Sequence, residues 1–206
     1  MNARLAGLLL TASVAGALVA SAGAAVADSS EGHIGAQEER GTAISSSRVT
    51  YATPAVRLMR ADGKPVSLPG ELDDGRPVVM NFIFTTCSSI CPLASQTFAE
   101  FARELGPDAS TVHLVSISVD PEQDTPARLT EYAHKYHAGS EWQFYTGTVD
   151  ASLSTQRAFD VYRGDKMMHT PVTLLRAAPG QPWLRLEGFV TPNELLHAYR
   201  ALLAAR

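Results

Sequence analysis

The sequence predicts an α/β domain of three layers, in which helices flank a sheet whose centre is largely parallel. Two near-continuous apolar runs, residues 77–84 and 112–119, are typical of strands that are buried on both faces. Segments with helical spacing of apolar residues alternate with these runs, and that alternation is the pattern of α/β proteins. The length of 206 residues, with 45% apolar and 18% charged, allows one domain of common size.

The elements up to the first long helix follow from local patterns. Residues 55–59 alternate apolar and polar side chains, and residues 65–68 can return after the Asp62–Gly63 turn, so the domain is expected to begin with a hairpin. After the first buried run, apolar residues at helical spacing predict a helix over 93–105, which Gly106–Pro107 ends.

The second half of the chain continues the alternation. Asp124 or Thr125 is expected to cap a helix, and Thr191 to Glu194 has the pattern that opens another. The predicted elements are a helix over 126–137, a strand over 142–145, a helix over 150–159, paired strands at a sheet edge over 171–175 and 184–187, and a last helix that ends near Ala205.

The amino terminus is expected to be an export signal. Residues 1–27 hold one charge, Arg4, followed by an apolar run and an A-x-A cleavage pattern before Asp28, which is the layout of a secretory signal peptide. The alternative is an uncleaved membrane anchor. Residues 28–50 are polar and lack apolar periodicity, so they are predicted to be a flexible linker before the domain of residues 51–206. Export would place the chain in an oxidising compartment.

Charge and cysteine content narrow the function. The net charge is −4 and there is no long basic run, so nucleic acid is not an expected partner. The chain has two cysteines, Cys87 and Cys91, directly after the first buried strand. In α/β sheets the sites lie beyond the carboxyl ends of the central strands, and this cysteine pair occupies that place.

The Cys87–Cys91 pair supports three interpretations. Four-residue spacing puts two side chains on one face of a helical turn, where they can close as a disulfide or open as thiolates. A following helix would lower the pKa of both thiols, although Pro92 disfavours a helical Cys91. Two thiolates suit Cu(I), with zinc second, and need a third ligand. The pair can also be a structural disulfide, but a disulfide that closes so short a loop adds little stability.

His169 is the predicted third ligand. It precedes the predicted strand at 171–175, which can run beside the first buried strand, so its ring could face the cysteines. Met167 and Met168 come directly before it; methionines usually pack in cores, but thioethers can also bind Cu(I). Asp120 ends the second buried strand, and we expect either a turn or capping acid or a group that supports the site.

The other histidines carry weaker signals. His134 and His137 are three residues apart on one predicted helix, where a solvated face is more common than a metal site. His33 falls in the predicted linker, and His113 falls within a strand, with no evident partner for either. The sequence holds no glycine-rich phosphate loop, G-x-S-x-G or H-E-x-x-H motif.

Two blocks resemble the Sco/SenC family of copper-handling, thioredoxin-like proteins. They are the run 78–92, with its Cys-x-x-x-Cys-Pro motif, and the run 116–126; His169 stands where the family's histidine ligand would fall. The resemblance covers about residues 50–206. It implies a thioredoxin-like fold, a central mixed sheet flanked by helices with an N-terminal hairpin, and copper ligation by Cys87, Cys91 and His169.

The resemblance also implies a function. The family delivers copper to the dinuclear copper centre of cytochrome c oxidase, reduces its thiols, or both. The leading hypothesis is therefore a periplasmic metallochaperone that holds Cu(I) or Cu(II) and passes it to the apo copper-bearing subunit of cytochrome c oxidase or another copper protein, with a thiol reductant as a second partner. Membrane association would follow only from an uncleaved signal segment.

The rival hypothesis is a thiol–disulfide oxidoreductase that uses Cys87 and Cys91 without metal, so enzymatic activity is left open. A peroxidase is less favoured because no arginine lies beside the cysteines in sequence. The chain departs from the family in a shorter segment before the histidine and in Met168, where an acid is common. Thr170–Pro171 resembles the cis-proline strand start of thioredoxins, whereas an ordinary strand-edge proline is trans.

Overall fold

Eight strands form one mixed sheet in the computed structural model, which describes residues 44–205. The order across the sheet is β1-β8-β7-β4-β5-β6-β2-β3. Strands β4, β5 and β6 are parallel, and the other pairs are antiparallel. The strands are β1 (Ser45–Val49), β2 (Arg57–Arg60), β3 (Pro65–Ser67), β4 (Val78–Ile83), β5 (His113–Ser118), β6 (Trp142–Thr146), β7 (Val172–Arg176) and β8 (Trp183–Glu187).

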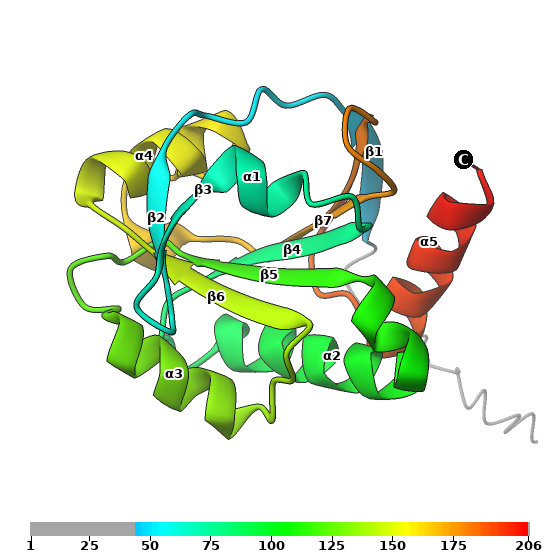
Figure 1. Cartoon of the computed structure of the whole chain (residues 1–206), viewed down its shortest axis with the longest axis horizontal. Coiled ribbons are helices and arrows are strands. Elements are labelled where there is room, and N and C mark those ends of the chain that lie inside the picture. The colour runs from blue at the N-terminus through cyan, green and yellow to red at the C-terminus, as the bar shows by residue number, and fades with distance from the viewer. Residues whose placement is uncertain (1–43, 206) are drawn as a thin grey trace, which may run out of the picture. The chain divides into compact units, whose positions relative to one another are not determined.

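Helices cover both faces of this sheet, as the alternating pattern predicted (Figure 1). Helices α2 and α3 lie against one face, and α1 and α4 lie against the other, while α5 packs beside α2. The helices are α1 (Leu68–Leu72), α2 (Ile90–Leu105), α3 (Pro126–Lys135), α4 (Val149–Ala158) and α5 (Pro192–Ala204), with short 3₁₀ turns η1 (Gly106–Thr111) and η2 (Lys166–Met168). The predicted α/β class with a central mixed sheet is confirmed.

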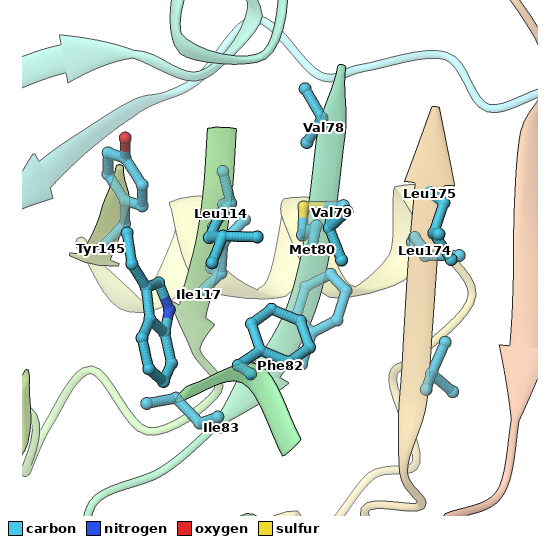
Figure 2. Close-up of a cluster of buried hydrophobic side chains, with 14 of the residues drawn as sticks. Val78, Val79, Met80, Phe82, Ile83, Leu114, Ile117, Tyr145, Leu174 and Leu175 are labelled. Carbon is cyan, nitrogen blue, oxygen red and sulfur yellow. The ribbon is translucent and has the colours of Figure 1, made fainter. Parts of the chain in front are cut away.

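The core is centred on the two apolar runs found in the sequence. All six residues of β4 and all six of β5 are buried, as expected for strands covered on both faces. Figure 2 shows side chains from β4 lying among those of β5, β6 and β7. Aromatic contacts join the layers: Phe98 of α2 lies 5.6 Å from Trp142, and Phe82 of β4 lies 6.1 Å from Phe159, measured between ring centroids.

The start of the domain differs from the prediction. The linker was expected to extend to residue 50, but Ser45–Val49 forms β1, which pairs antiparallel with β8. The sequence did not predict this strand because four of its five side chains are exposed and show no apolar pattern. The strand is held by main-chain hydrogen bonds. The predicted edge strand at 184–187 is therefore covered by β1. The predicted signal peptide and residues 28–43 of the linker lie outside the described residues.

The predicted turns and caps are confirmed in most places. The hairpin of β2 and β3 turns at Gly63, and Thr191 and Glu194 form a capping box at the start of α5. Of the two predicted caps for α3, the side chain of Thr125 accepts the hydrogen bond from the Arg128 N–H. Across residues 44–205, none of the helices has the length and apolarity needed to cross a bilayer.

Candidate functional site

The cysteine loop leaves the carboxyl end of β4 and enters the first turn of α2. The Cys87 N–H donates to the Phe84 carbonyl at 3.2 Å, so the chain turns immediately after the strand. Cys91 lies in the first turn of α2, and its N–H donates to the Cys87 sulfur at 3.4 Å. Cys87 is half-buried, Cys91 is buried, and both thiols are free. The helix thus directs a main-chain donor at the more accessible sulfur.

This geometry differs from the expected helical turn. Cys87 lies outside the helix, before its N-terminus, whereas Cys91 lies within the first turn. The two side chains therefore do not share one face of a helix. Helix α2 begins at Ile90, two residues before Pro92, although proline disfavours a helical residue before it. The helix tolerates Pro92 because the first N–H groups of a helix have no intrahelical partner, so none is lost.

The two thiols have opposite pKa shifts. Partial burial raises the pKa of Cys87, but hydrogen bonds from Cys91 and Ser89 stabilise its thiolate, and the resulting pKa is below the ordinary value. Burial, with a smaller contribution from the neighbouring Cys87, raises the pKa of Cys91 to about 12. The prediction of a lowered pKa therefore holds for Cys87 and is wrong for Cys91, because the helix N-terminus faces the first sulfur while the second is in the interior.

His169 lies at the end of η2, directly before β7, and β7 pairs with β4 as predicted. Its Nε2 is 3.1 Å from the Phe82 carbonyl oxygen. A carbonyl only accepts, so Nε2 carries the proton and Nδ1 carries the free lone pair. Burial lowers the pKa of His169. The hydrogen bond to Phe82 raises the pKa and the charge of Arg163 lowers it, and the resulting pKa is below the ordinary value. The ring is therefore neutral at pH 7, which is the form that binds metal.

Cys91 and His169 line the same small cavity between α2 and the sheet. Its volume is about 20 Å³, and Asn81 of β4 also lines it. The Asn81 amide has a fixed orientation: the Trp142 Nε1–H donates to the Ser116 hydroxyl, which in turn donates to the Asn81 oxygen. The buried Asn81 nitrogen then has no hydrogen-bond partner, so the cavity holds an unused donor.

The three predicted ligands are only partly brought together. Cys87 contacts Cys91, and Cys91 shares its cavity with His169. Within residues 44–205, no three His, Cys, Asp or Glu side chains stand in an arrangement ready to hold a metal ion. The Nε2 side of the histidine ring is turned toward the Phe82 carbonyl.

Asp124 anchors the cysteine loop, a role that sequence reasoning missed. Its buried carboxyl group accepts hydrogen bonds from the Thr85 N–H at 3.1 Å, the Thr85 hydroxyl at 2.5 Å and the Ser118 hydroxyl at 2.6 Å. Thr85 lies two residues before Cys87, so Asp124 connects the cysteine loop to the end of β5. The sequence suggested only that Asp124 or Thr125 caps a helix, because capping is local and this contact spans 39 residues.

Asp120 anchors the histidine segment. Its buried carboxylate is 2.5 Å from the Lys166 ammonium, and Lys166 lies three residues before His169. The Asp120 carbonyl also accepts turn hydrogen bonds from Gln123 and Asp124. The turn role expected for Asp120 is thus confirmed, and its role as a group that supports the site stays a prediction. Asp120 and Asp124 together hold the segments of the three predicted ligands against the end of β5.

The remaining histidines lie away from this site. His134 is exposed on α3, as expected for a solvated helix face, whereas His137 is exposed just beyond the helix, which ends at Lys135 and not at residue 137. His113 begins β5, at the opposite end of the strand from the cysteines. It is not without partners: its Nδ1–H donates to the Glu71 carbonyl at 3.0 Å, and its Nε2 lies 3.2 Å from the Tyr145 hydroxyl. Both ring nitrogens of buried His113 therefore have polar partners, which accounts for its burial without a role in binding.

A dithiol after the first parallel strand, over the N-terminus of the next helix, defines a thioredoxin-like protein with an added histidine before a neighbouring strand. The chain belongs to the SCO1/SenC family, whose family model matches residues 47–204. A SCO1 protein homolog of Bacillus subtilis is 34% identical over 106 residues, which span 51% of this chain and 54% of that protein. The chain therefore matches about half the length of this relative.

Solved structures agree with the family. The Bradyrhizobium japonicum protein ScoI, whose structure has copper bound, is 25% identical with a TM-score of 0.60, over 73% of this chain and 99% of that one. BsSco, described as a member of the Sco family of cytochrome c oxidase assembly proteins, is 23% identical with a TM-score of 0.63, over 78% of this chain and 98% of that one. The thioredoxin-like fold predicted from the resemblance is confirmed.

Proposed function

We propose that this chain is a periplasmic copper metallochaperone that assists assembly of the dinuclear copper centre of cytochrome c oxidase. Cys87, Cys91 and His169 would hold the copper ion, as Cu(I) or Cu(II), and pass it to the apo copper-bearing subunit by ligand exchange. Membership of the SCO1/SenC family and the copper-bound structure of the Bradyrhizobium japonicum relative support this proposal. An A-x-A pattern at residues 25–27 supports export.

The observation that carries the proposal is the state of His169 beside the cysteine cavity. Metal-binding histidines usually donate their other N–H to a carbonyl or carboxylate, which fixes the tautomer. His169 does this through Nε2 and Phe82, so a neutral Nδ1 is left to bind metal. Soft thiolates together with one imidazole suit copper. Copper binding would release thiol protons, so affinity should fall on acidification.

The second candidate is a thiol–disulfide oxidoreductase without metal. The different environments of the two thiols favour it: an accessible Cys87 with a lowered pKa suits nucleophilic attack, and a buried Cys91 suits the resolving role. Attack of the Cys87 thiolate on a partner disulfide would form a mixed disulfide and expel one partner thiolate. Attack by Cys91 would then release the second partner thiolate and leave the Cys87–Cys91 disulfide.

Anaerobic copper titration of the reduced protein separates the two functions. We expect Cys87→Ser, Cys91→Ser and His169→Ala each to weaken Cu(I) affinity by more than about 100-fold, since loss of a mere supporting partner of a ligand already costs about 10–100-fold. His134→Ala, on the exposed face of α3, is the control and should bind as the wild type does. Unchanged tight binding in all three ligand variants would refute the metallochaperone. Loss of thiol exchange in the cysteine variants alone, without any copper binding in the wild type, would support the oxidoreductase.

A further inference from the structure

Two adjacent methionines are presented to solvent beside the predicted ligand His169. Met167 is 70% exposed and Met168 is 66% exposed, the highest fractions among the large apolar side chains of residues 44–205. The usual role of methionine is to fill gaps in a core. At such exposure burial contributes little to stability, so packing does not account for these two side chains.

The turn that carries the methionines is held by the protein. The Met167 N–H donates to the Asp165 carboxylate at 2.9 Å, and the Met168 N–H donates to the Asp165 carbonyl at 3.0 Å. The ion pair of Lys166 with buried Asp120 fastens the same turn to the end of β5. The two thioethers thus extend outward from an anchored backbone.

The same turn faces the cysteine cavity on its inner side. His169 follows Met168 directly, and its ring points inward to the Phe82 carbonyl, while the methionine side chains point outward. Consecutive Cα atoms are about 3.8 Å apart, so the Met168 thioether and the His169 imidazole extend from neighbouring points of the same backbone. An ion held on the outer side would need only a short transfer to reach His169.

We propose that Met167 and Met168 form a Cu(I) capture site at the mouth of the cysteine–histidine site. Thioether sulfur is a soft ligand that suits Cu(I) and binds hard cations poorly. This inference rests on the proposed copper function and assigns the route by which copper reaches that site. The ion first binds to the two thioethers and then moves by ligand exchange to His169 and the cysteines.

The transfer needs no electron donor or acceptor. Each Cu–thioether bond breaks as a Cu–thiolate or Cu–imidazole bond forms, the thiol protons pass to solvent, and copper stays in the +1 state. Thioethers carry no ionisable proton, so the capture site should keep its affinity in mild acid, where thiol ligands compete with protons. A docking role for the same side chains would depend on their apolar surface, which leucine preserves, and not on sulfur.

The first test uses the protein with Cys87→Ser and Cys91→Ser, in which the thiol ligands are gone. Its methionines carry ¹³C-labelled methyl groups, and Ag(I), a redox-inert stand-in for Cu(I), is added. We expect the methyl signals of Met167 and Met168 to shift together, at pH 7 and at pH 5, and those of half-buried Met59 and buried Met80 to stay in place. Unshifted Met167 and Met168 signals would overturn the proposal.

The second test measures how fast reduced protein with intact cysteines takes Cu(I) from a weak chelator. The variant Met167→Leu with Met168→Leu should load at least about 10-fold more slowly than wild type, with little change in final affinity, while Met59→Leu loads normally. Loading at the wild-type rate would show that the sulfur atoms are not used and would overturn the proposal. Failure of the proposed function would give a different result from failure of the capture site: the cysteine and histidine variants would then retain tight copper binding.

Discussion

In the reduced, folded protein at pH 7, we expect iodoacetamide to alkylate Cys87 at least about 100-fold faster than Cys91. Thiolates are the reactive form, and a pKa of about 12 leaves roughly one Cys91 thiol in 10⁵ ionised at this pH. The higher intrinsic reactivity of a more basic thiolate recovers part of that deficit. Burial of the Cys91 side chain, which is 1% exposed, adds a steric barrier.

Mass spectrometry of the labelled protein over time measures the two rates. The Cys87 rate should rise with pH and level off at a lower pH than the rate of an ordinary cysteine, because its pKa is below the ordinary value. In denaturant the two cysteines should react at similar rates, since burial and the helix N-terminus are lost. Equal rates in the folded protein would contradict the described placement of the two sulfurs.

We expect Asp124→Ala to lower the free energy of unfolding by about 3 kcal/mol or more. The change leaves the half-buried N–H and hydroxyl of Thr85 and the buried hydroxyl of Ser118 without their acceptor, and an unsatisfied buried group costs about 1–3 kcal/mol. For a domain of this size, the corresponding drop in melting temperature is roughly 6–12 °C. Thermal and urea unfolding followed by circular dichroism measure both quantities.

The matched control is Asp124→Asn, which keeps the shape and one acceptor oxygen and should lose less stability. Asp150→Ala, at the exposed start of α4, should change stability by less than about 1 kcal/mol. Because Thr85 leads into the cysteine loop, Asp124→Ala should also narrow the difference between the alkylation rates of Cys87 and Cys91. A fully stable Asp124→Ala protein with unchanged alkylation would contradict the anchoring role.

The sequence predicted those elements whose signal is local. The runs that became β4 and β5 are apolar throughout because both faces of these strands are covered by helices, and the caps of α3 and α5 use residues next to the helices they cap. Strand β1 was missed because it is held by main-chain hydrogen bonds to β8 and its side chains are mostly exposed, which leaves no periodicity to detect.

The sequence predicted which residues form the candidate site, but not the different environments of the two thiols. Spacing and the strand end located Cys87 and Cys91, but only the fold shows that one sulfur faces the helix N-terminus while the other is buried. The contacts of Asp124 with Thr85 and of Asp120 with Lys166 join segments 39 and 46 residues apart. No local pattern encodes such pairs. The exposure of Met167 and Met168 likewise depends on how the turn is anchored.

The proposed function requires one copper ion to be bound by two sulfurs and one imidazole from distant segments of the chain. X-ray absorption spectroscopy of the anaerobically loaded protein, compared with His169→Ala, measures this directly. We predict two sulfur ligands and one nitrogen ligand in the wild type, and loss of the nitrogen ligand in the variant. A copper shell with the same nitrogen content in both proteins, or without any sulfur in the wild type, would contradict the claim.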